Sequence, residues 1–261
     1  MHTPTNTPRR STIDLNSDLG ESYGSWTMGT DEAVLDLVSS ANIACGFHAG
    51  DAAVLMKTVA AAQVRNVRIG AHIGYNDIAG FGRRAMDYDH DVLMSETIYQ
   101  IGAIQAAATT VGATVDYVKP HGALYNRIAV DEAQAAAVIT SIKRLNPELS
   151  LMALSGSQIV EQAQSEGLTV IQETFADRAY TATGALVPRS QAGAVHHDPE
   201  VAAAQALAFA TGQPITSIDG TPVQMQADSI CVHGDNPAAL DLVRQIIIRL
   251  AEHDVEVRHA A

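Results

Sequence analysis

Short apolar runs alternate along the chain with longer segments that have one apolar face. The short runs are rich in β-branched residues, and the longer segments repeat apolar residues at spacings of three and four, as amphipathic helices do. We expect seven strands, at Thr12–Leu15, Ala41–Cys45, Arg68–His72, Val115–Lys119, Leu149–Leu154, Leu168–Gln172 and Ser229–His233. We expect six helices, at Asp51–Arg65, Tyr88–Val111, Asp131–Leu145, Ser157–Ser165, Pro199–Thr211 and Pro237–Glu252. This alternation is typical of a parallel sheet covered by helices.

Residues that typically start helices or form turns support this assignment of strands and helices. Asp51 and Asp131 are predicted N-caps, because their carboxylates can accept the first free N–H groups of a helix. The Asp-Gly pair at 219–220 predicts a type I′ hairpin turn before the seventh strand, since that turn needs positive φ angles. The stretches 73–87 and 173–198 are predicted to be loops over a site rather than linkers.

The length and composition fit one folded domain. The chain has 261 residues, of which 47% are hydrophobic and 17% charged, so it can form a large core and is not disordered in bulk. Because α/β barrels of about 250 residues usually form one domain, and no break in composition marks a second, we expect a single domain at 12–261. Residues 1–11 are polar and contain two Thr-Pro pairs, which predicts a flexible tail.

Charge, cysteine content and hydropathy indicate which partners the protein is expected to bind and in which cell compartment it is expected to act. A net charge of −13 repels nucleic acid and anionic membrane surfaces, so neither is an expected partner. Cys45 and Cys231 give no disulfide framework, which favours the cytoplasm, and we expect both to pack as small buried residues. The N-terminus lacks the apolar segment of a signal peptide, and no apolar run reaches the ~18 residues of a membrane span.

Polar side chains gather where the predicted strands end, which is where α/β barrels and open α/β sheets bind ligands. Residues at these positions, among them four of the ten histidines, are Asn16, Asp18, Glu21, His48, His72, Lys119, His121, Tyr125, Glu173, Arg178, His233 and Asp235. Taken singly, Asp18 also fits a turn or helix cap, and His48 and His233 fit exposed turn residues. Arg83 and Arg84 also fit solvated loop charges. The clustering of so many reactive side chains nevertheless predicts an enzyme.

Several common catalytic motifs are absent from the sequence. It contains no GxxxxGK[ST] phosphate loop, no G-x-S-x-G elbow, no HExxH pair and no CxxC spacing. A nucleotide-binding site is therefore not evident in this chain.

Five segments together resemble one known family: DLNSDLGES at 14–22, NIACGFHAGD at 42–51, GAHIGYND with FGRR at 70–84, VKPHGALYN at 118–126 and ADSICVHGDNPAA at 227–239. From about Ile13 to Val257 the chain is similar to the LamB/YcsF family. The resemblance implies a seven-stranded parallel (βα) barrel like that of the glycoside hydrolase/deacetylase superfamily, in agreement with the seven predicted strands. It also implies ATP-dependent hydrolysis of the lactam of 5-oxoproline to L-glutamate, carried out with two partner subunits, B and C.

Roles for the candidate residues follow from that reaction as hypotheses. Asp18 is the candidate general base, with His48 or His121 as its acid/base partner. Lys119 is expected to face an oxyanion or phosphoryl group. The substrate carboxylate is expected to meet arginine, either Arg178 or the pair Arg83 and Arg84. Further candidate substrate-binding residues are Asn16, Glu21, His72, Tyr125, Glu173, His233 and Asp235.

Whether a metal ion is required stays open from the sequence. Deacetylases of the superfamily that the chain resembles use an Asp and two His, and Asp18, His48 and His72 offer such a set. Those enzymes usually take both His from one H-x-x-x-H motif, which this chain lacks, and a proton-transfer set explains the same residues equally well. We therefore expect no required metal, and ATP consumed by the complex at a site not evident in this chain.

Two other functions also fit the sequence. One is a metal-dependent amide or carbohydrate deacetylase that acts alone, which rests on the implied fold. The other is a non-catalytic subunit that binds a lactam or a sugar.

Overall fold

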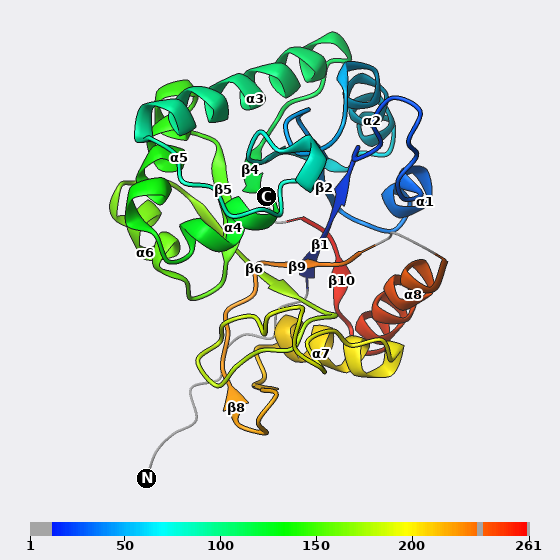
Figure 1. Cartoon of the computed structure of the whole chain (residues 1–261). Coiled ribbons are helices and arrows are strands. Elements are labelled where there is room, and N and C mark those ends of the chain that lie inside the picture. Colours follow the sequence, from blue (N-terminus) through cyan, green and yellow to red (C-terminus); the bar gives the residue numbers. More distant parts are fainter. Residues whose placement is uncertain (1–11, 234–236, 260–261) are drawn as a thin grey trace.

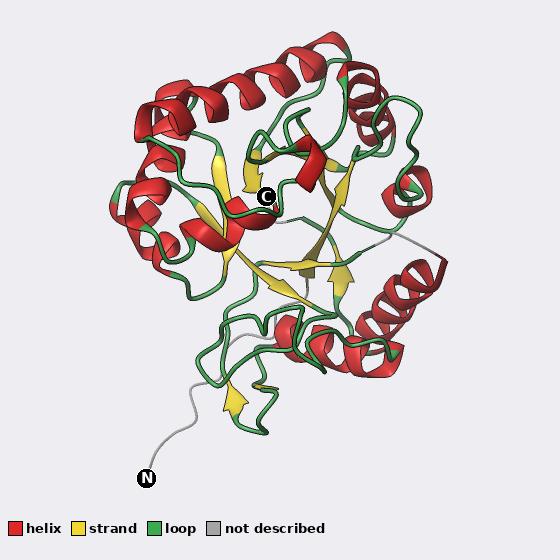
Figure 2. Ribbon diagram, in the orientation of Figure 1, coloured by secondary structure: helices red, strands yellow, loops and turns green. Residues whose placement is uncertain are grey.

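Seven parallel strands form the centre of this computed structural model, which describes residues 12–233 and 237–259 (Figure 1 and Figure 2). They are β1 (Thr12–Leu19), β2 (Ser40–Ala44), β3 (Arg68–Ile73), β4 (Tyr117–Pro120), β5 (Ser150–Leu154), β6 (Val170–Phe175) and β9 (Ser229–Cys231). Each strand pairs with the next, and β9 pairs with both β6 and β1, so the sheet closes. The predicted seven-stranded parallel barrel is therefore confirmed. The tail predicted at 1–11 and the candidate residue Asp235 lie outside the described residues.

Helices surround the barrel on its outside (Figure 1). They are α1 (Asp31–Leu35), α2 (Ala52–Val64), α3 (His90–Thr110), α4 (Gly122–Ile128), α5 (Glu132–Leu145), α6 (Gln158–Ser165), α7 (Pro199–Thr211) and α8 (Pro237–Glu252). The six predicted helices are present, and Asp51 and Asp131 cap α2 and α5 as predicted. The sequence did not reveal α1, α4 or the 3₁₀ turn η1 (Ile78–Gly80), because such short elements show no repeated apolar spacing.

The first strand is longer than predicted, and this changes the position of two site residues. Asn16 and Asp18 do not follow β1 but lie within it, and they share one face with Asp14 because side chains alternate along a strand. That face points into the barrel, where Asn42 on β2 donates to Asn16 Oδ1 at 2.7 Å and to Asp18 Oδ1 at 2.8 Å. The hydroxyl of Tyr117 donates to Asn42 at 2.7 Å. A polar network therefore fills the interior below the site.

The outer face of the same strands carries the apolar core. Leu15, Ile43 and Val118 alternate with these polar residues and are completely buried in the cluster that the strands share with the helices. Burying each such side chain contributes about 1.5–3 kcal/mol, so the core stabilises a barrel whose interior is free to carry polar chemistry. None of the helices in the described part of the chain combines the length and hydropathy needed to cross a membrane.

A hairpin precedes β9, as predicted, but its turn differs from the prediction. It pairs β7 (Ile215–Thr216) with β8 (Pro222–Val223) in antiparallel register. In the connecting loop, 217–221, the positive φ is at Gly220 (86°) and not at Asp219, so the predicted type I′ turn is wrong. The Ser217 hydroxyl accepts the N–H of Thr221 at 2.9 Å, and this local side-chain bond favours a different turn.

Candidate active site

The carboxyl ends of the strands enclose a cavity of about 690 Å³. Seven candidate residues line it: Asp18, His72, Arg83, Lys119, His121, Tyr125 and Arg178. Arg127, Phe175 and Arg189 line it as well and were not predicted. The site region expected from the strand ends is thus present, since parallel strands of a closed barrel bring their carboxyl ends to one side.

Lys119 lies at the floor of this cavity between two carboxylates. Its Nζ is 2.9 Å from Asp18 Oδ1, 2.8 Å from Glu173 Oε1 and 3.2 Å from Asn16 Oδ1, and its side chain is almost fully buried. Burial alone would lower the pKa of Lys119, but Asp18 and Glu173 outweigh it and hold that pKa well above its usual value. The ammonium therefore stays charged. It donates to Asp18, to Asn16 and to Cys231 Sγ at 3.4 Å, and it forms an ion pair with Glu173.

Asp18 is held as a carboxylate by the same contacts. Burial would raise its pKa, but His72 and Lys119 outweigh this and hold the pKa of Asp18 well below its usual value. Lys119 and Asn42 both donate to Oδ1, whereas Oδ2 lies 3.2 Å from His72 Nε2. Oδ2 is therefore the oxygen that the site can use. A carboxylate with so low a pKa is a weak base, which limits the general-base role suggested by the sequence.

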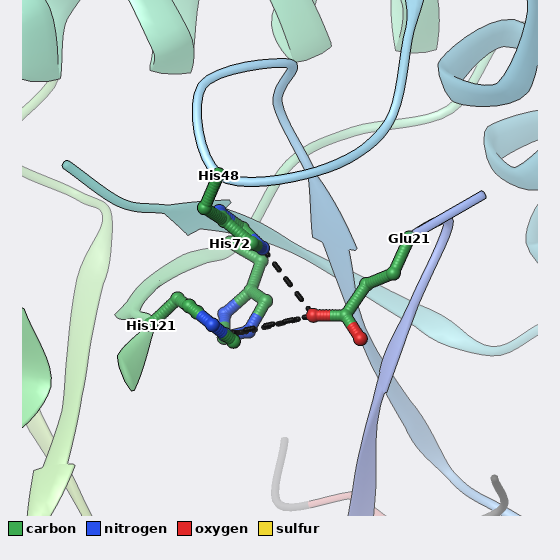
Figure 3. A group of neighbouring side chains, drawn as sticks. All are labelled: Glu21, His48, His72 and His121. Atoms are coloured by element: carbon green, nitrogen blue, oxygen red, sulfur yellow. Dashed lines mark hydrogen bonds and ion pairs between the residues drawn. The ribbon is translucent and has the colours of Figure 1, made fainter. Parts of the chain in front are cut away.

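Four residues next to Asp18 form a cluster that we call the Glu21–histidine cluster: Glu21, His48, His72 and His121 (Figure 3). Glu21 follows β1, His48 lies between β2 and α2, His72 lies on β3, and His121 follows β4. Glu21 Oε1 is 3.3 Å from His48 Nε2, 3.5 Å from His121 Nδ1 and 3.9 Å from His72 Nε2. The sequence identified all four residues but not that they meet at one point.

Close packing holds the rings of this cluster in place. His48 stacks on His121 with ring centroids 3.9 Å apart, and His72 meets both rings edge-on. At Gly82, whose φ is +62°, a Cβ would lie 2.7 Å from His48 Cβ and 2.9 Å from His121 Cδ2, so only glycine allows this approach. Burial, followed by the neighbouring histidines, holds the pKa values of His48 and His121 well below the usual value. Both rings are therefore neutral near pH 7.

His233 belongs to a separate pair at the rim. Its Nδ1 is 2.7 Å from Oδ2 of Asp177, a residue that follows β6 and was not predicted to belong to the site. Burial would lower the pKa of His233, but Asp177 outweighs it and raises that pKa, and His233 in turn helps to lower the pKa of Asp177. Arg189 lies next to this pair, with its Nη2 3.4 Å from His233 Nε2. The pair therefore favours an ionised carboxylate and an imidazolium.

The arginines expected to hold a substrate carboxylate are placed differently from the expectation. Arg178 is buried, and it donates to the backbone oxygens of Val187 at 2.6 Å and Ala194 at 3.2 Å, so it fixes the loop over the cavity. Arg84 is paired with Asp77 and does not line the cavity. Arg83 does line it. The expected roles of Arg178 and Arg84 do not fit this geometry, because their guanidinium groups already have protein partners.

Both cysteines are buried, as expected. Burial raises the pKa of Cys45 to about 12, and it raises the pKa of Cys231 well above the usual value. Neither thiol is therefore an activated nucleophile.

These features define a class of protein: a closed parallel α/β barrel with a buried lysine, two carboxylates and a histidine cluster at the carboxyl ends of its strands. Comparison with known proteins then gives the family. The LamB/YcsF family matches residues 13–261, and the chain belongs to this family.

Individual relatives agree with this assignment. The chain is 83% identical over 248 residues to a protein of Corynebacterium efficiens named as the A subunit of 5-oxoprolinase, covering 95% of this chain and 97% of that one. It is 40% identical to the crystal structure of a lactam utilization protein from Thermus thermophilus, with a TM-score of 0.91, covering 95% of this chain and 100% of that one. A family 4 carbohydrate esterase from Streptomyces lividans is 12% identical with a TM-score of 0.50, covering 95% and 92%, and shows a likeness of fold alone.

Proposed function

We propose that this chain is one component of an ATP-dependent 5-oxoprolinase, which hydrolyses the lactam of 5-oxo-L-proline to L-glutamate while ATP is converted to ADP and phosphate. The observation that carries the proposal is the 83% identity, across 95% of the chain, to a protein named as the A subunit of 5-oxoprolinase. That name implies partners, which we take to be subunits B and C, and the complex acts in the cytoplasm. Because the sequence has no phosphate-loop motif, we assign ATP binding to the partners.

The cavity suits a small acid that carries an amide. Its volume of about 690 Å³ lies within the range of roughly 300–1,000 Å³ typical of ligand sites and exceeds what a five-membered lactam acid needs. Arg83 and Arg189, which line the cavity, are the cations that we propose for the substrate carboxylate. The additional volume leaves room for a phosphoryl group on the lactam oxygen.

Hydrolysis needs a water molecule that is held and polarised beside the lactam carbonyl. We assign its orientation to Asp18 Oδ2, since Oδ1 is occupied by Lys119 and Asn42. Lys119 acts as a positioning residue, because its ammonium already donates to Asp18, Asn16 and Cys231 and forms an ion pair with Glu173. Its charge still lowers the energy of an oxyanion formed nearby. This modifies the direct oxyanion contact expected from the sequence.

The test is reconstitution from purified subunits. The chain alone is expected to release neither phosphate from ATP nor glutamate from 5-oxoproline, and both are expected when B and C are added together. Asp18→Asn should reduce glutamate release by about 10² or more without preventing assembly, as followed by gel filtration. Asp241→Asn, which changes an exposed carboxylate, is the matched control and should leave the rate unchanged.

Two outcomes would contradict the proposal. Stoichiometric glutamate and phosphate release by the isolated chain would remove the need for partners. A folded Asp18→Asn chain with unaltered turnover in the mixture would favour the alternative of a non-catalytic, substrate-binding subunit. The deacetylase alternative is supported by a likeness of fold alone, and turnover of an acetylated substrate without ATP would revive it.

A further inference from the structure

Two histidines of the Glu21–histidine cluster have their protons placed by backbone carbonyl groups. His72 Nδ1 lies 3.0 Å from the Lys119 carbonyl oxygen, and His121 Nε2 lies 2.9 Å from the Phe81 carbonyl oxygen. A carbonyl oxygen only accepts, so each of these two nitrogens must carry the hydrogen. In the neutral rings, His72 Nε2 and His121 Nδ1 therefore present lone pairs.

These two lone pairs face each other inside a ring of further acceptors. His72 Nε2 and His121 Nδ1 are 3.0 Å apart. Glu21 Oε1 lies 3.5 Å from the His121 nitrogen and 3.9 Å from the His72 nitrogen, and Asp18 Oδ2 lies 3.2 Å from the latter. Acceptors that approach so closely in a buried site repel one another unless a positive centre lies between them. The arrangement therefore calls for a cation.

His48 completes the set from the other side. Its Nε2 is 3.3 Å from Glu21 Oε1, and its Nδ1 is buried without a hydrogen-bond partner among the described residues. The ring is fixed by stacking on His121 rather than by a polar contact of its own. One nitrogen of His48 thus faces the same point as the nitrogens of His72 and His121.

We infer that Glu21, His48, His72 and His121 bind one divalent transition-metal ion of the zinc type. Bonds of about 2.0–2.1 Å in a tetrahedron place ligand atoms about 3.3 Å apart. Four of the ligand-atom pairs here are separated by 3.0, 3.3, 3.5 and 3.9 Å, and all lie within 4.8 Å of one another. Three imidazoles and one carboxylate suit Zn²⁺ and its neighbours, whereas Mg²⁺ and Ca²⁺ prefer oxygen ligands.

The surroundings of the cluster support a metal rather than a shared proton. His48 and His121 are buried, and a buried site disfavours a charged imidazolium, so their nitrogens stay available as ligands. The carbonyl groups behind His72 and His121 orient the rings in the way typical of metal-binding histidines. His72 and His121 also line the cavity, where a metal ion supplies Lewis acidity and lowers the pKa of bound water.

This inference replaces the metal-free site expected from the sequence, and it does not rest on the proposed substrate. His48 and His72 belong to the set that the sequence offered, but Glu21 and His121 take the place of Asp18. The reason is that Glu21 and the three histidines bring their ligand atoms within 4.8 Å of one another, whereas Asp18 Oδ2 lies beside this set, 3.2 Å from His72 Nε2.

The experiment uses the untagged chain without partner subunits. After removal of metal with a chelator, Zn²⁺, Co²⁺ or Mg²⁺ is added and the bound metal is measured by elemental analysis. One Zn²⁺ or Co²⁺ per chain is expected, together with the visible absorption of tetrahedral Co²⁺, and no stoichiometric Mg²⁺. Zn²⁺ at about a hundred times its Kd should raise the melting temperature by roughly 5–10 °C.

Variants show whether the named residues hold the ion. Glu21→Gln and His121→Gln should each weaken binding by about a hundredfold or more. His233→Gln is the matched control, because His233 is a histidine at the same end of the barrel that pairs with Asp177 instead, and it should leave metal binding unchanged. Circular dichroism verifies that each variant is folded, and His48→Gln replaces any variant that is not.

The inference is overturned if the chain binds much less than one Zn²⁺ or Co²⁺. It is also overturned if the folded Glu21 and His121 variants bind the metal as the wild type does. Either result would identify the positive centre as a proton. Because no partner, ATP or 5-oxoproline is present, that outcome would leave the proposed lactam hydrolysis standing. If the chain binds one metal ion but releases no glutamate when B and C are added, the metal site stands and the proposed lactam hydrolysis fails.

Discussion

Replacing Lys119 with Met removes the one ammonium that lies between Asp18 and Glu173 while keeping much of its length and apolar bulk. The Nζ atom is 2.9 Å from one carboxylate and 2.8 Å from the other, and its side chain is almost fully buried. Removing one partner of a buried ion pair costs about 3–5 kcal/mol, because the remaining charge is left unpaired. We therefore expect Lys119→Met to lower the free energy of unfolding at pH 7 by about that amount, and the melting temperature by roughly 10 °C.

The pH dependence of this loss follows from the direction of the Asp18 shift. In the wild-type chain the folded-state pKa of Asp18 is depressed, so its contribution to stability is present above its unfolded pKa of about 3.9 and is lost as pH falls through the folded value. The variant lacks the part of this contribution that Lys119 supplies. The difference in stability between the two proteins should therefore persist above about pH 4 and shrink as the pH falls below that value.

Catalysis should respond in a way that a purely structural role for Lys119 does not explain. An opposite charge this close lowers the pKa of the Asp18 carboxyl, so its removal should move the acidic limb of kcat/KM to higher pH. Turnover should fall about 10² or more because Asp18 is no longer held in place. The assay is glutamate release by the reconstituted complex across pH, alongside urea unfolding of the isolated chain.

Two comparison variants separate the causes. Lys119→Met combined with Glu173→Gln removes one of the unpaired carboxylates, so it should recover stability without recovering turnover. Lys143→Met breaks the exposed pair with Glu166 and should change stability by less than about 1 kcal/mol. A Lys119→Met chain as stable as the wild type, or one with an unshifted acidic limb, would refute this account of the buried lysine.

Two further predictions concern the barrel interior and the rim. Gly70→Ala should destabilise the chain by about 3 kcal/mol in urea unfolding, since its Cβ would lie 2.2 Å from ring carbons of Tyr117. Gly102→Ala, where a Cβ has open space within a helix, should instead stabilise it by about 0.5–1 kcal/mol, and equal effects at both sites would contradict the packing argument. Asp177→Asn should lower the pKa of His233, followed by NMR of the ring proton, because Asp177 raises it. In the wild type, His233 adds stability below about pH 6.5, and this stability is lost as pH rises through its folded pKa. The variant should lack this contribution. An unshifted His233 titration in the variant would argue against the pair.

The order of strands and helices could be predicted from the sequence because it depends on local periodicity. Each predicted strand and helix is present in the barrel, and the errors fall where local signals are weak. The end of β1 was predicted too early because polar residues such as Asn16 and Asp18 are typical of loops. In this barrel they lie within the strand, because the barrel interior is polar. The turn at 217–221 was mistaken because a serine hydroxyl, rather than the Asp-Gly pair, sets its backbone.

The region of the site could also be predicted, because parallel strands in a barrel must bring their carboxyl ends together. This rule alone placed Asp18, Lys119 and His121 around one cavity. It gave no information on which side chains pair, since Lys119 and Asp18 are 101 positions apart and the contact depends on how the barrel closes.

The tertiary structure alone decided the chemistry of each group. The arginines illustrate this, because Arg178 and Arg84 lose their expected role to partners that the fold supplies, whereas Arg83 keeps access to the cavity. The histidines illustrate it further, because the carbonyl group of Phe81 fixes the proton of His121 and turns a lone pair toward Glu21. Residue type and strand position are local and can be read along the chain, whereas ion pairing, ring orientation and pKa depend on neighbours that only the closed barrel brings within reach.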